Sequence, residues 1–237
     1  MSEKVRIEPN LILHFVRDLG YHTWIGNRIQ AGIPPTQKLN PREQKEFQAI
    51  ITVVSKSVAK GFILAAYQPE LPSNLFEQMN RKWPGYAYKL LEEMLHQYEV
   101  SLSNNFAERW ESSREPNQLV STSTQTETET VMMSEKIKIQ PSLVLDFVLE
   151  LGINDSVRLF DLDPTKRLGV KESKQVENLA NEISQAIIKG MILTHYRQEL
   201  AIAAVEQMNQ EKKGFADEQL KEMLFVYQSF LYQKYNL

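Results

Sequence analysis

The sequence contains no cysteine, which excludes disulfide bonds, a catalytic thiol and metal sites with cysteine ligands. No apolar run approaches the ~18 residues that a membrane-spanning helix needs, and the N-terminal residues MSEKVRIEPN lack the apolar core of a secretory signal. Neither sign of charge is in excess, because 27 Lys and Arg oppose 30 Asp and Glu. We therefore expect a cytoplasmic protein without membrane contact, and the net charge of −3 gives no general argument for nucleic acid.

Recognisable catalytic motifs are also missing. The four histidines, His14, His22, His96 and His195, show neither the His-x-x-x-His nor the Glu-x-x-His spacing of metal sites. No phosphate-binding glycine loop, nucleophile elbow or dinucleotide fingerprint is present. The sequence therefore predicts no metal, no cofactor and no catalytic residue.

The main positive feature is an internal repeat. Residues 1–20 (MSEKVRIEPNLILHFVRDLG) match residues 133–152 (MSEKIKIQPSLVLDFVLELG) at 12 of 20 positions, at a spacing of 132. The match resumes at a spacing of 129, where Glu77-Gln78-Met79-Asn80 recurs as Glu206-Gln207-Met208-Asn209. We predict two tandem copies of one domain, residues 1–110 (the first repeat) and 133–237 (the second repeat). The second begins with its own Met133, as if two complete reading frames had fused.

The segment between the repeats has a different composition. Residues 111–132 contain nine Ser or Thr among 22 residues and few apolar side chains that could be buried. Such a composition is typical of disordered chains, so we predict a flexible linker. Its r.m.s. span of about 25 Å would let the repeats either pack together or separate.

Each repeat has the apolar spacing of amphipathic helices, and neither has an alternating run long enough for a β-sheet. The clearest helix begins with Asn40 as N-cap and Pro41 in its first turn and extends for about 25 residues. Its apolar stripe comprises Phe47, Ile50, Ile51, Val54, Val58, Gly61 and Ala65, matched by Val176, Leu179, Ala180, Ile183, Ile187, Gly190 and Thr194. The predicted fold is all-α, a helical bundle of about four helices per repeat.

Several helix ends can be predicted from local signals. Pro9 and Pro141 suit the first turn of a short helix, and Gly20 and Gly152 suit its left-handed C-terminal position. Ser73 is a candidate N-cap for a short helix that ends at Met79. In the second repeat, Ala201–Ala204 favour a helix that continues without this break. A last helix is expected over 86–102 and 216–235.

Two recurring features admit both a structural and a functional interpretation. Gly61 and Gly190 lie inside the long helices, where glycine costs about 1 kcal/mol relative to alanine, and close approach of a crossing helix would explain them. A hinge or a ligand notch is the alternative. Glu77 and Glu206 in the recurring tetrapeptide would suit acid–base catalysis only in a cleft beside a partner. We favour hydrogen bonding on a helix surface, with Met79 and Met208 in the core.

The repeats differ in charge and in aromatic content. Residues 1–110 carry 13 Lys and Arg and 11 Asp and Glu (net +2), whereas residues 134–237 carry 13 and 15 (net −2). All three tryptophans, Trp24, Trp83 and Trp110, belong to the first repeat. Basic and aromatic residues gather there in two places, and they form the predicted partner-binding set: Tyr21, Trp24, Arg28, Lys38, Arg81, Lys82 and Trp83.

This residue set fits more than one partner. Trp, Tyr and Arg are enriched at protein interfaces, whereas basic groups beside aromatic rings also suit single-stranded nucleic acid. Our leading hypothesis is a non-enzymatic adaptor, scaffold or assembly subunit that binds a protein partner, and the opposite net charges would permit the repeats to pair with each other. The alternative is a small helical subunit of a nucleoprotein complex that contacts RNA or single-stranded DNA through the first repeat. An enzyme with a site between helices is the third hypothesis.

Overall fold

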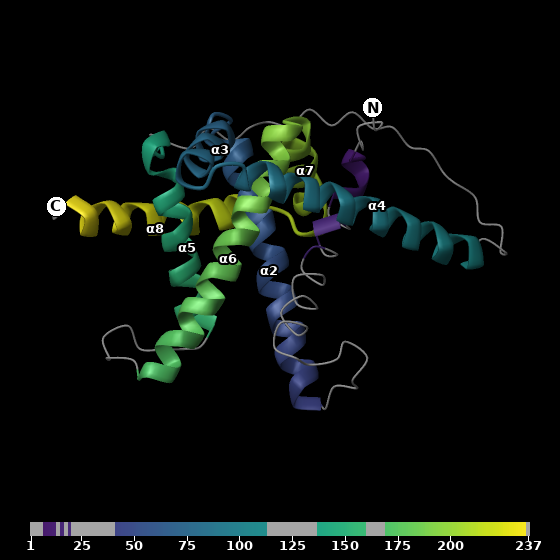
Figure 1. Ribbon diagram of the computed structural model, residues 1–237, viewed down its shortest axis with the longest axis horizontal. Coiled ribbons are helices and arrows are strands. Elements are labelled where there is room, and N and C mark those ends of the chain that lie inside the picture. Colours follow the sequence, from purple (N-terminus) through teal and green to yellow (C-terminus); the bar gives the residue numbers. More distant parts are fainter. Residues whose placement is uncertain are drawn as a thin grey trace.

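The computed structural model describes residues 7–12, 15, 16, 19, 41–112, 137–159 and 169–235. This part of the chain contains seven α-helices, two short 3-10 helices and no strand, which confirms the all-α prediction (Figure 1). Within it, no helix is long and apolar enough to cross a membrane. The elements are η1 (Pro9–Leu11), α2 (Pro41–Tyr67), α3 (Leu71–Lys82), α4 (Tyr86–Ser112), η2 (Pro141–Leu143), α5 (Val144–Leu159), α6 (Val170–Tyr196), α7 (Glu199–Glu211) and α8 (Phe215–Tyr235).

The two long helices, α2 and α6, are the centre of the molecule. Figure 1 shows them side by side towards their C-terminal ends and splayed apart towards their N-terminal ends. They begin at Pro41 and Val170 and are equally long, 27 residues each. Proline at the first position suits a helix start, because it lacks an N–H that would be unpaired there. The described apolar stripe positions from Val54 to Ala65, and their counterparts in α6, are buried.

The crossing of α2 and α6 explains the two glycines inside them. A Cβ on Gly61 would lie 2.3 Å from the carbonyl oxygen of Ile187 and 3.0 Å from the Cα of Gly190. A Cβ on Gly190 would lie 2.3 Å from the carbonyl oxygen of Val58. Only glycine permits this backbone contact, and the predicted close approach of a crossing helix is confirmed.

The described residues form one hydrophobic core to which both repeats contribute. Each of the shorter helices packs mainly on the long helix of the other repeat. Helix α3 of the first repeat packs on α6, and α7 of the second repeat packs on α2. The predicted linker falls outside the described residues, except that its first two residues extend α4 to Ser112. The C-terminal parts of α4 and α8 project on opposite sides of the molecule (Figure 1).

Three local predictions were wrong. Gly152 does not end a helix but lies inside α5, where a Cβ would meet the carbonyl oxygen of Ala180 at 2.4 Å; its role is close packing on α6. Ser73 is not an N-cap, because α3 already begins at Leu71, whose N–H bonds to the carbonyl of Gln68. In the second repeat α6 and α7 are separate helices rather than one. Gly20 lies outside the described residues.

Positive φ occurs instead at Gly85 (79°) and Gly214 (75°), in the turns before α4 and α8. The two glycines are 129 residues apart, at equivalent places in the repeats. Because this left-handed conformation costs little only for glycine, the turn that starts each last helix depends on them. They hold Trp83 and Lys212, the residues that follow α3 and α7, close to the start of the next helix.

Candidate functional site

The recurring tetrapeptide holds the two repeats together. The side-chain amide of Gln78 donates a hydrogen bond to the carbonyl of Pro141 (2.5 Å), and that of Gln207 donates to the carbonyl of Pro9 (2.6 Å). Each glutamine thus reaches the N-terminal segment of the other repeat. Met79 and Met208 are buried, as predicted.

A second pair of contacts across the repeats comes from Gln68 and Arg197, which are also 129 residues apart. The Gln68 amide donates to the carbonyl of Ile139 at 2.8 Å and accepts from its N–H at 3.0 Å. The Arg197 guanidinium donates to the carbonyl of Ile7. Neither residue was predicted from the sequence, because the two equivalent positions carry different residue types. The 129-residue spacing was the signal that relates them.

Equivalent tyrosines fix each N-terminal segment on its own repeat. The hydroxyl of Tyr98 accepts from the N–H of Glu8, and that of Tyr227 from the N–H of Gln140, both at 2.8 Å. Burial raises the pKa of Tyr98. The recurring residues Gln78 and Gln207, and Tyr98 and Tyr227, are therefore used in holding the chain together.

The predicted partner-binding set is only partly placed. Tyr21, Trp24, Arg28 and Lys38 lie outside the described residues. Arg81, Lys82 and Trp83 lie together at the C-terminal end of α3, and all three are exposed.

These three residues differ in their surroundings. Arg81 pairs with Glu77 at 3.5 Å, and the ammonium of Lys82 lies 4.7 Å from the centroid of the Trp83 ring. The Trp83 side chain is 41% exposed. The structure therefore brings a cation and an indole together at the surface, whereas Arg81 forms an exposed ion pair with Glu77.

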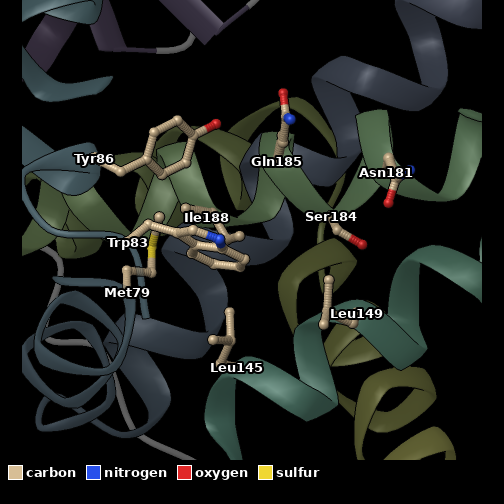
Figure 2. A pocket seen from close by; sticks show the side chains of 9 residues that line it. All are labelled: Met79, Trp83, Tyr86, Leu145, Leu149, Asn181, Ser184, Gln185 and Ile188. Atoms are coloured by element: carbon tan, nitrogen blue, oxygen red, sulfur yellow. The ribbon is translucent and has the colours of Figure 1, made fainter. Parts of the chain in front are cut away.

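A cavity of about 340 Å³, which we call the Trp83 cavity, lies between the two repeats (Figure 2). Its apolar wall is formed by Met79 of α3, Ile188 of α6 and Leu145 and Leu149 of α5. Figure 2 shows the indole of Trp83 projecting into it.

The remaining lining of the Trp83 cavity is polar or aromatic. Asn181, Ser184 and Gln185 follow one side of α6, and Tyr86 stands above the indole (Figure 2). The hydroxyl of Ser184 donates to the carbonyl of Ala180 at 2.8 Å. None of the described residues that line this cavity is charged.

A second cavity, of about 220 Å³, lies at the equivalent place in the other half; we call it the Lys212 cavity. Six of its lining residues are 129 positions from six that line the Trp83 cavity. These pairs are Met208 and Met79, Lys212 and Trp83, Phe215 and Tyr86, Ser55 and Ser184, Lys56 and Gln185, and Ala59 and Ile188. The fold thus forms equivalent cavities in its two halves. Aromatic and uncharged residues line the Trp83 cavity, whereas lysines are part of the lining of the Lys212 cavity.

Lys189 and His195, both with lowered pKa values, lie elsewhere. Burial lowers the pKa of Lys189, and the nearby Glu93 partly opposes this. Burial likewise lowers the pKa of His195, whose ring stacks on Phe76 with centroids 4.4 Å apart and whose Nδ1 lies 3.2 Å from the Ser73 hydroxyl. In the described part of the chain, no three His, Asp or Glu side chains gather as metal ligands.

Large aromatic side chains are exposed on α8. Phe225 is 68% and Tyr232 61% exposed, and the two are seven residues apart, so they share one face of the helix. Tyr235, 50% exposed, lies near the projecting end (Figure 1). These residues were not predicted from the sequence, because Phe225 has His96 as its counterpart and belongs to no recurring motif.

The chain shows no significant match to any protein-family model, curated protein sequence or solved structure.

Proposed function

We propose that this protein is a non-enzymatic, cytoplasmic interaction module, an adaptor, scaffold or assembly subunit, in which two repeats act as a fused pair. The use of recurring polar residues supports this proposal. Gln78 and Gln207 bond across the repeats, and Asn209 accepts from the N–H of Ala216 at 3.1 Å at the start of α8. These recurring polar side chains thus hold the fold together.

The exposed aromatic face of α8 is the observation that carries the proposal of a protein partner. Side chains such as Phe225 and Tyr232 dominate the binding energy of protein interfaces, because they bury a large apolar area on association. Their spacing of seven residues matches the repeat along which a second helix packs. We therefore propose an amphipathic helix of a protein partner as the occupant of this face.

The test immobilises the full chain and the double variant Phe225→Ser/Tyr232→Ser and compares the proteins that each captures from extract of the source cell, with and without nuclease treatment. We expect proteins bound by the wild type to fall at least about tenfold on the double variant, since a hot-spot residue contributes about 2 kcal/mol. Ile202→Ser, which alters a 60% exposed apolar residue of α7, is the matched control and should retain them.

Equal capture by the double variant, with helicity unchanged by circular dichroism, would contradict the assignment of the α8 face. Loss of all captured proteins on nuclease treatment would contradict a direct protein contact and favour the second candidate function below.

That second candidate is contact with single-stranded nucleic acid through the first repeat. The pair of Lys82 and Trp83 favours it, because an indole stacks on a base while the ammonium meets a phosphate. Binding of a labelled single-stranded oligonucleotide should then weaken steeply between about 50 and 200 mM salt and should depend on both residues. Salt-independent binding, or none, would dismiss this candidate.

A further inference from the structure

The Trp83 cavity has the features of a small-molecule site rather than of a packing defect. Its volume of about 340 Å³ lies at the lower end of the ~300–1,000 Å³ range of ligand clefts. Its deepest residues are almost inaccessible to solvent, with Met79 at 0% and Leu145 and Ile188 at 5% exposure. Its walls come from four helices of both repeats, so the pairing of the repeats itself creates the site.

The lining restricts the charge of a ligand. No charged residue lines the cavity among those that the structure describes, and Lys82 is engaged with the indole of Trp83. In the Lys212 cavity, by contrast, Lys56, Lys212 and Glu211 are part of the lining. An ion placed against the buried wall of Met79, Leu145 and Ile188 would lose hydration without gaining a partner, so an uncharged ring is favoured there.

The lining also restricts the shape of a ligand. Trp83 and Tyr86 supply aromatic rings, arranged edge to face with centroids 6.1 Å apart, and the leucines of α5 form the opposite wall. A planar ring that enters between these walls can pack on the indole and bury its apolar area on Leu145 and Leu149. The Lys212 cavity has no indole, because Lys212 stands where Trp83 does.

Two side-chain amides supply the polar contacts. Asn181 and Gln185 are one helical turn apart on α6, and both are exposed to solvent at the cavity. The hydroxyl of Ser184 is already bonded to the carbonyl of Ala180. An amide offers a donor and an acceptor together, and so matches a ligand group with the same pair.

We propose that the Trp83 cavity binds a small, planar, uncharged aromatic ligand that carries a carboxamide or a similar donor–acceptor group. The ring packs on Trp83 within the apolar walls, and the donor–acceptor group meets Asn181 and Gln185. This site is separate from the α8 face, so the two proposals can fail independently.

The probe is indole-3-carboxamide, and its binding to the full chain is measured by saturation-transfer NMR and by titration. We expect saturable binding, weakened about tenfold by Trp83→Ala, since stacking on one aromatic side chain contributes about 1–3 kcal/mol. Gln185→Leu should weaken binding by removing a polar contact, and it leaves the contact between the ligand ring and Trp83 intact. Lys212→Ala, at the equivalent position of the other cavity, and Phe225→Ser, on the α8 face, should bind as the wild type does.

The negatively charged indole-3-carboxylate should bind more weakly than the amide, because a carboxylate has no donor for the side-chain oxygens of Asn181 and Gln185. Three results would overturn the proposal. They are no saturable binding of the amide, binding that survives both Trp83→Ala and Gln185→Leu in variants of unchanged helicity, and equal affinity for the carboxylate. Loss of binding in Lys212→Ala alone would likewise overturn it by placing the probe in the other cavity.

Discussion

At the scale of single residues, the glycines at 61 and 190 determine how closely α2 and α6 approach. Each presents its backbone directly to the other helix, and the space for a Cβ is taken by main-chain atoms that cannot move independently. Gly152 of α5 is a similar case, because a Cβ there would meet the main-chain oxygen of Ala180 in α6. Small residues here are a condition for packing rather than a source of flexibility.

Substitution Gly61→Ala separates two opposing effects. Helix propensity alone predicts a gain in stability of about 1 kcal/mol, whereas overpacking at a backbone contact costs about 1–3 kcal/mol. Because the nearest atom would be only 2.3 Å away, we expect overpacking to dominate and the free energy of unfolding to fall by about 2 kcal/mol in urea titrations. Glu177→Ala, on the exposed side of α6, is the control; a stabilised Gly61→Ala variant would contradict the crossing.

Another residue-scale prediction concerns the ion pair between Lys60 of α2 and Asp155 of α5. Nζ and Oδ2 are 2.5 Å apart, and the side chains are only 7% and 14% exposed. Asp155→Asn leaves a buried ammonium without its counter-charge, so we expect a loss of about 3 kcal/mol in the free energy of unfolding. Glu77→Gln, which breaks the exposed pair with Arg81, should change it little.

The double variant Lys60→Met/Asp155→Leu sharpens this test. An apolar pair of similar size removes both buried charges and should recover most of the stability lost in Asp155→Asn. A single variant as stable as the wild type would show instead that Lys60 reaches solvent.

At the scale of whole elements, the short helices α3 and α7 connect the repeats. Each lies mainly on the long helix of the other repeat and carries the glutamine that bonds to that repeat's N-terminal segment. The arrangement is reciprocal, because the contacts of α3 with η2 correspond to those of α7 with η1. A change in either helix therefore acts on the pairing of the repeats and not only on its own repeat.

Gln207→Ala tests this connection. It removes the hydrogen bond to the carbonyl of Pro9, so we expect a decrease of about 1 kcal/mol in the free energy of unfolding. Faster amide hydrogen exchange in α7 should accompany it. Gln210→Ala, three residues further along α7 and exposed, is the matched control and should behave as the wild type does.

At the scale of the whole molecule, the shared core makes the two repeats interdependent. Buried side chains from both form one cluster, and the Trp83 and Lys212 cavities exist only where the repeats meet. The two cavities nevertheless differ in lining, because Trp83 lines one where Lys212 lines the other.

Cutting the chain between the repeats tests this interdependence. With a protease site inserted in residues 113–132, the cleaved halves should co-elute in gel filtration and keep the helicity of the intact protein, because their core is common. They should separate only in denaturant. Halves that separate in native buffer would contradict a shared core and support two independently folded domains.

Part of the candidate site could be predicted from sequence. Arg81, Lys82 and Trp83 were expected at a surface because of their residue types, and they are exposed. Neither the cavity beside Trp83 nor the place of Gln185 in its lining could be predicted, because residues about 100 positions apart in the sequence form this cavity. Tyr21, Trp24, Arg28 and Lys38 lie outside the described residues and remain a prediction.

The helical class, the two long helices, the burial of Met79 and Met208 and the small residues at 61 and 190 could be predicted from the sequence. These follow from local rules, since a period of 3.6 residues marks a buried face and an internal glycine marks a close approach. The partner of each face depended on the folded chain. Gly152 was predicted to end a helix, and nothing indicated that Gln78 would bond to the other repeat, because periodicity indicates burial but not the packing partner. That choice depends on the path of the whole chain, which here places α3 and α7 on the opposite repeat.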